Sequence, residues 1–142
     1  KTFWPGRFEK VSDQPLIIMD GANNYEGMQA LVATLQEHFS NYKVTTLFAT
    51  LKDKENDKIL NELGKVADQV ILTSFDFPRA IEPQEVISLV PKHVKFDVID
   101  NWEEALEKLV NKAQRNELIL ITGSLYFVSQ VRPYFKKSNK IV

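Results

Sequence analysis

Four short, largely apolar runs alternate along the chain with stretches whose apolar residues recur every three or four positions. The runs occupy residues 15–19, 44–49, 70–73 and 118–121. An uninterrupted apolar run of this length is typical of a strand buried on both faces, whereas spacing of three and four residues is typical of an amphipathic helix. The pattern therefore predicts buried strands that alternate with helices.

Two asparagines are expected to start helices. Asn24 precedes a helical stripe at residues 28–39, and Asn101 precedes a second stripe at residues 102–113, with Glu104 three positions after it. An Asn side chain at such a position accepts a hydrogen bond from a backbone N–H of the first turn, which otherwise has no partner. Each Asn is therefore predicted to be an N-cap.

Prolines mark the limits of two other helices. Pro83 suits the first turn of a short helix, because its missing N–H is not needed there. Pro133 is expected to end the last helix, in which Leu125, Val128 and Val131 are spaced to point inward.

The order of these elements predicts the fold class. A stripe at residues 59–66 supplies the remaining helix, and alternation at residues 94–98 indicates a strand near an edge of the sheet. Residues 8–11 are expected to add a strand at the start. Strands and helices in strict alternation form a mostly parallel sheet with helices on both faces. We therefore expect an α/β, Rossmann-like doubly wound fold, in a single domain over residues 1–142.

Composition excludes several functional classes. Nine Phe, four Tyr and two Trp supply a core and argue against disorder. No apolar run approaches the roughly 20 residues of a membrane span, and 18 Lys and Arg against 19 Asp and Glu give no general attraction to nucleic acid or membrane. The absence of Cys removes disulfides and Cys-ligated zinc and fits a cytoplasmic protein. His38 and His93 lack metal-ligand spacing, so no metal site is expected.

Polar residues follow each predicted strand, at the edge of an open parallel sheet where ligands bind. These segments are residues 20–24, 50–54, 74–79 and 122–124. The sequence contains neither GxGxxG nor GxxxxGK[ST], so it carries no phosphate-binding loop of its own.

Three residues in these segments have both a structural and a functional interpretation. Asp20 could accept the hydroxyls of a ribose or cap the turn that follows it, and the pattern alone favours the cap. Ser124 precedes a helix, where backbone N–H groups could hold a carboxylate or where its hydroxyl could act as the N-cap. Arg79 could bind a carboxylate through its guanidinium, although a solvated Arg is the commoner case.

Five segments taken together resemble a known family. They are WPGRFE at residues 4–9, DGANN at 20–24, DK at 53–54, PRA at 78–80 and TGSLY at 122–126. In this order and spacing they resemble the C-terminal domain of folylpolyglutamate synthase/dihydrofolate synthase, a branch of the Mur ligase superfamily. The resemblance covers essentially the whole chain, and it implies the fold of a Mur ligase C-terminal domain.

The resemblance implies an ATP-dependent ligase. Such an enzyme activates the carboxylate of dihydropteroate or folate as an acyl phosphate, which the amino group of L-glutamate then attacks. The P-loop and the Mg²⁺ ligands of the family belong to an N-terminal ATPase domain that is absent here, so neither catalytic residues nor metal ligands are expected in this chain. Because the sequence opens on Lys1 rather than Met, we expect the C-terminal (glutamate ligase) domain of a longer enzyme, inactive alone.

The same resemblance implies roles for five residues. Arg7 would contact the nucleotide phosphates of ATP, and Asp20 its ribose. Asn23 and Ser124 would contact the incoming glutamate, and Arg79 matches an Arg that holds the amino-acid carboxylate in related cell-wall ligases. The chain departs from the family at Asn23, where His is usual, and an amide cannot carry a positive charge.

Two other interpretations stay open, namely the C-terminal domain of a cell-wall Mur ligase and a stand-alone Rossmann-like binding module. WPGRFE and GSLY argue against the first, and a Walker-type segment encoded upstream of Lys1 would argue against the second. The expected partners are small molecules (ATP, L-glutamate, and dihydropteroate or folate) and the protein's own N-terminal ATPase domain. Neither nucleic acid nor a membrane is expected.

Overall fold

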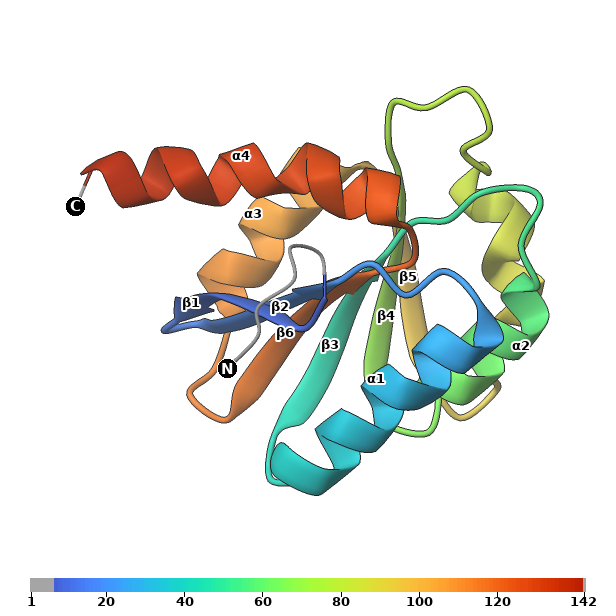
Figure 1. Cartoon of the computed structure of the whole chain (residues 1–142), viewed down its shortest axis with the longest axis horizontal. Helices are drawn as coiled ribbons and strands as arrows, with labels where there is room; N and C mark the ends of the chain where they lie inside the picture. The colour runs from blue at the N-terminus through green and yellow to red at the C-terminus, as the bar shows by residue number, and fades with distance from the viewer. Residues whose placement is uncertain (1–6, 142) are drawn as a thin grey trace.

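The computed structural model describes residues 7–141, which form a six-stranded sheet with helices on both of its faces (Figure 1). The strands are β1 (Glu9–Asp13), β2 (Leu16–Asp20), β3 (Lys43–Phe48), β4 (Gln69–Ser74), β5 (Lys95–Asn101) and β6 (Glu117–Thr122). Their order across the sheet is β1-β2-β6-β3-β4-β5, with β1 antiparallel to β2 and all other neighbours parallel. The predicted α/β, doubly wound fold is confirmed, and β5 is an edge strand as predicted.

Helices cover the two faces of the sheet (Figure 1). One face carries α1 (Tyr25–His38), α2 (Asn56–Leu63) and the 3₁₀ helix η1 (Pro83–Leu89), and the other carries α3 (Trp102–Lys112) and α4 (Leu125–Ile141). None of these helices is long and apolar enough to cross a membrane, within the residues that the structure describes.

The core is split by the sheet because successive strand residues point to opposite faces. In β2, Ile18 packs with α1 and α2, whereas Ile17 and Met19 pack with α3 and α4. All three are buried, as expected for a strand covered on both sides. The apolar run that predicted this strand is thus explained by two separate hydrophobic clusters.

Both predicted N-caps are confirmed. The backbone N–H of Gly27 donates to Oδ1 of Asn24 at 2.7 Å, and that of Glu104 donates to Oδ1 of Asn101 at 2.8 Å. Asn24, only four residues after the end of β2, thereby fixes where α1 begins.

Two predictions about the last helix were wrong. Pro133 lies inside α4, which continues to Ile141. Pro133 has no N–H to donate to the carbonyl of Ser129, four residues earlier in the helix. Both residues are exposed, so water can donate a hydrogen bond to that carbonyl instead. Leu125 is 47% exposed rather than inward, because the buried stripe of α4 starts two positions later, at Phe127 and Val128.

Candidate functional site

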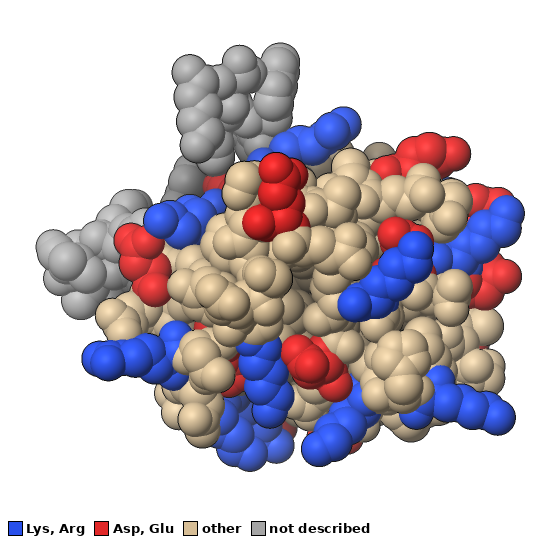
Figure 2. Space-filling model, turned by 90° about the horizontal axis from the view of Figure 1, so that it is seen from below, with Lys and Arg blue, Asp and Glu red and all other residues tan. Residues whose placement is uncertain are grey.

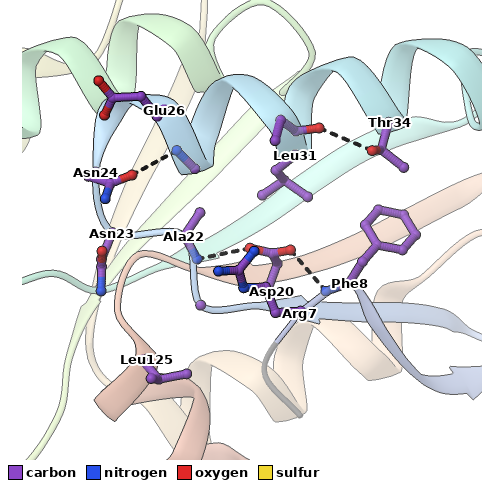
Figure 3. Close-up of a pocket in the computed structure, with 13 residues that line it drawn as sticks. Arg7, Phe8, Asp20, Ala22, Asn23, Asn24, Glu26, Leu31, Thr34 and Leu125 are labelled. Atoms are coloured by element: carbon purple, nitrogen blue, oxygen red, sulfur yellow. Dashed lines mark hydrogen bonds between the residues drawn. The ribbon is translucent and has the colours of Figure 1, made fainter. Parts of the chain in front are cut away.

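A cavity of about 610 Å³ opens at the carboxyl end of β2, beside the first turns of α1 (Figure 3). Its volume falls in the range of small-molecule sites, about 300–1,000 Å³. The lining comes from Arg7 and Phe8, from the loop at residues 20–24, from one side of α1 and from Leu125 at the start of α4. The cavity lies at the edge of the sheet where the sequence predicted a ligand site.

Asp20 ends β2 and is the buried carboxylate of this cavity. Its Oδ1 accepts a hydrogen bond from the N–H of Ala22 at 2.9 Å, and its Oδ2 accepts one from the N–H of Phe8 at 2.9 Å (Figure 3). The first contact is the predicted cap of the turn, and the second ties down the segment before β1. Each carboxylate oxygen can still accept a second hydrogen bond.

The charge state of Asp20 reflects opposing influences. Burial raises the pKa of its carboxyl above the ordinary value of 3.8, because the anion loses water. The N–H groups of Phe8 and Ala22 and the positive charge of Arg7 act in the opposite direction. The group is therefore a desolvated acceptor whose anion is supported by two backbone donors and one cation.

Arg7 lies at the exposed side of the cavity, with its side chain beside Asp20 (Figure 3). The next residue, Phe8, has φ of 43°, in the left-handed region that residues with a side chain rarely adopt. The Phe8 ring packs against Phe39, with ring centroids 5.7 Å apart. A fixed bend thus leads from Arg7 into β1 and places a guanidinium next to a buried carboxylate.

Asn23 also lines the cavity, from the loop that joins β2 to α1. Its neighbour Asn24 is occupied as the cap of α1, so Asn23 is the amide of the pair that is not used to start the helix. An amide both donates and accepts hydrogen bonds.

Ser124 is buried at the N-terminus of α4. Its Oγ accepts hydrogen bonds from the N–H groups of Tyr126 at 3.1 Å and Phe127 at 3.4 Å, which makes it the N-cap. Ser124 is not among the residues that line the cavity. Of the two interpretations of Ser124, the geometry therefore supports the N-cap.

Arg79 lies outside the cavity. Its Nη1 is 3.0 Å from Oδ2 of Asp53, and both side chains are exposed. The loops that carry them are further joined where the N–H of Lys52 donates to the carbonyl of Arg79 at 2.9 Å. The structure thus brings together Arg7, Asp20 and Asn23, and leaves Arg79 and Ser124 outside the cavity.

Several residues that line the cavity were not predicted from the sequence. Phe8 was missed because its contribution is a backbone N–H, and Leu125 was assigned to the core. Ala30 and Thr34 line the cavity from the exposed side of α1, where nothing in the sequence distinguishes them from ordinary surface positions.

No group of three or more His, Asp or Glu side chains that could hold a metal ion occurs within the described part of the chain. The cavity itself is lined by two carboxylates, the buried Asp20 and the exposed Glu26, and the positive charge of Arg7 acts on Asp20.

Comparison with known proteins gives a consistent result. The family model described as "Mur ligase, glutamate ligase domain" matches residues 6–125. The dihydrofolate synthase/folylpolyglutamate synthase of Bacillus subtilis (strain 168) is 37% identical over 142 aligned positions, which cover 96% of this chain and 31% of the relative.

Solved structures of folylpolyglutamate synthases have the same fold as this chain. Mycobacterium tuberculosis folylpolyglutamate synthase complexed with ADP superposes with a TM-score of 0.86 at 26% identity, covering 94% of this chain and 32% of that one. A bifunctional folylpolyglutamate synthase/dihydrofolate synthase with Mn, AMPPNP and L-glutamate bound superposes with a TM-score of 0.85 at 25% identity, with the same coverage. The chain thus spans about a third of the length of these relatives. The resemblance read from WPGRFE, DGANN and TGSLY is confirmed, and the chain belongs to the Mur ligase family as a glutamate ligase domain.

Proposed function

We propose that the chain is the C-terminal, glutamate ligase domain of an ATP-dependent enzyme that joins L-glutamate to dihydropteroate or folate. The observation that carries the proposal is the convergence of Arg7, Asp20 and Asn23 on one cavity at the carboxyl edge of the sheet. Relatives that match nearly the whole chain have this activity in their names, and one of them was solved with ADP.

In this proposal the cavity holds ATP as a substrate. The guanidinium of Arg7 offsets the charge of the phosphates, which it can contact with two parallel N–H donors. The free lone pairs of Asp20 accept the ribose hydroxyls, while the N–H groups of Phe8 and Ala22 keep the carboxylate in place. A carboxylate that is already oriented by backbone donors loses little freedom on binding.

The glutamate contacts are assigned to Asn23, Ser124 and Arg79. Asn23 reaches the cavity directly, and Ser124 keeps its own O–H as a donor because its oxygen only accepts in the cap. The exposed ion pair of Arg79 with Asp53 is worth little, so Arg79 can exchange that partner for a substrate carboxylate at low cost.

The remaining parts of the reaction are assigned to an N-terminal ATPase domain of the same protein. This chain has no phosphate-binding loop, and the relatives are about three times as long as the matched region. That domain would supply the P-loop and the Mg²⁺ ligands, and the acyl phosphate of dihydropteroate or folate would form where the two domains meet. Attack by the amino group of L-glutamate then forms the amide and releases phosphate.

Substrate competition tests the proposal. The whole protein, meaning this chain together with the proposed ATPase domain, is incubated with ATP, labelled L-glutamate and either dihydropteroate, a folate or a muramyl precursor. Label is expected to enter only the pteroate or folate product. Transfer to the muramyl precursor would identify a cell-wall ligase instead, and ATP hydrolysis by the 142-residue chain alone would contradict the division of labour.

A further inference from the structure

An ion pair joins the first strand, β1, to the last helix, α4. Nη2 of Arg132 on α4 lies 2.8 Å from Oε1 of Glu9 on β1, and Nε lies 3.4 Å from Oε2. The two residues are 123 positions apart, and their side chains are only 22% and 14% exposed. A guanidinium that faces both carboxylate oxygens from partial burial fixes direction as well as distance.

One partner of the ion pair, Glu9, is adjacent in sequence to a residue with a strained backbone. Glu9 follows Phe8, whose φ of 43° requires outside contacts to hold it. The N–H of Phe8 donates to Asp20, and its ring packs against Phe39, which directly follows α1. Arg132 adds a third anchor, from the helix on the opposite face of the sheet.

The ion pair is not needed for β1 to exist as a strand. β1 pairs with β2 from Glu9 opposite Met19 to Asp13 opposite Leu16, and a bulge lies between Lys10 and Ser12. The backbone ladder therefore already secures this strand, but it ends at Glu9 and does not reach Arg7.

We infer that Arg132 is a positioning residue for the nucleotide site, because its ion pair with Glu9 fixes the bend at Phe8 that aims Arg7 at the cavity. Neither Glu9 nor Arg132 lines that cavity, so the effect passes through Phe8. The inference rests on the proposed function in one respect, the contact of Arg7 with the nucleotide phosphates.

Amide hydrogen exchange tests the structural half in the 142-residue chain. Arg132→Gln is expected to speed exchange of the Phe8 N–H roughly tenfold, while amides of β3 and β6 keep their protection. Lys10→Gln is the matched control, because it removes an exposed β1 ion pair with Asp13 that does not reach α4. Arg132→Lys keeps the positive charge but loses the two N–H donors of the guanidinium. Its Phe8 exchange rate is expected to lie between those of Arg132→Gln and Lys10→Gln. Unchanged exchange at Phe8 in Arg132→Gln would overturn the inference.

Kinetics of the whole protein test the functional half. Arg132→Gln is expected to raise the KM for ATP roughly tenfold, the equivalent of about 1.4 kcal/mol, with kcat and the KM for glutamate unchanged. Exchanging the charges in the double variant Glu9→Arg/Arg132→Glu is expected to restore most of the affinity. If Arg7→Ala raises the KM for ATP and Arg132→Gln does not, the inference is wrong while the proposed function stands. If neither variant changes that KM, the proposed role of Arg7 is wrong, and the inference is wrong with it.

Discussion

Asp20 has a structural role in the fold and a proposed role in nucleotide binding, and the two are compatible. The sequence predicted that its carboxylate would cap the following turn, and the N–H of Ala22 does donate to it. The bond from Phe8 was not predictable, because it joins residues 12 positions apart and depends on β1 folding back onto β2. A carboxylate held by two backbone donors is already oriented for a ligand in the free protein.

Replacement of Asp20 tests its proposed ribose contact. Asp20→Ala is expected to raise the KM for ATP about tenfold or more in the whole protein, and the KM for folate much less, since one substrate loses an acceptor. The variant is also expected to lose about 1–3 kcal/mol of unfolding free energy, because the N–H groups of Phe8 and Ala22 lose their partner. Equal changes in the two KM values would remove the ribose role.

The raised pKa of Asp20 makes a prediction about stability and pH. The folded chain binds the Asp20 proton more tightly than the unfolded chain, so this carboxyl lowers the unfolding free energy as pH rises. The loss begins near the ordinary pKa of 3.8 and is complete above the raised pKa. Denaturant unfolding of wild type and Asp20→Asn should therefore show a difference, wild type minus variant, that falls with rising pH through this window. If this difference in unfolding free energy rises with pH instead, the backbone donors and Arg7 outweigh burial in setting the pKa of Asp20.

At the scale of elements, local pattern predicted the strands and helix starts but not the order of the strands. Buried runs and the Asn caps depend on neighbouring residues, whereas the insertion of β6 between β2 and β3 depends on how distant helices pack. That order explains which of the predicted site residues lie together. β2 and β4 are separated by β6 and β3, so the loop of Arg79 begins roughly 14 Å from Asp20 at about 4.8 Å per strand.

The turn from β6 into α4 requires a glycine. Gly123 has φ of 121°, and a Cβ built there would lie 2.2 Å from the carbonyl oxygen of Ala49. Gly123→Ala is therefore expected to lower the unfolding free energy by about 3 kcal/mol or more, since strain and a backbone clash add. Chemical denaturation measures the unfolding free energy of both proteins. A loss below about 1 kcal/mol would show that the ends of β6 and β3 can move apart to make room for the Cβ.

Ser124 and Asn101 form a matched pair of helix caps. Each accepts a backbone N–H at the start of its helix, but only Ser124 stands at the carboxyl edge of β6. Alanine at either position is expected to cost about 1 kcal/mol of stability. If Ser124 also contacts glutamate, Ser124→Ala raises the KM for glutamate and Asn101→Ala does not. The same glutamate KM in both variants would leave Ser124 as a cap only.

For the whole molecule, the cavity and the charge distribution indicate a local rather than a general attraction for anions. Seen from below, basic and acidic side chains are interspersed over the surface (Figure 2), in keeping with 18 Lys and Arg against 19 Asp and Glu. A nucleotide would therefore be recognised by Arg7 and its surroundings, not by an overall field.

A structure of the whole protein with ADP bound tests the central claim most directly. We expect a ribose hydroxyl within about 3.2 Å of an Asp20 carboxylate oxygen, and the guanidinium of Arg7 facing the phosphates. A nucleotide held entirely by the ATPase domain, with Asp20 and Arg7 out of contact, would contradict it.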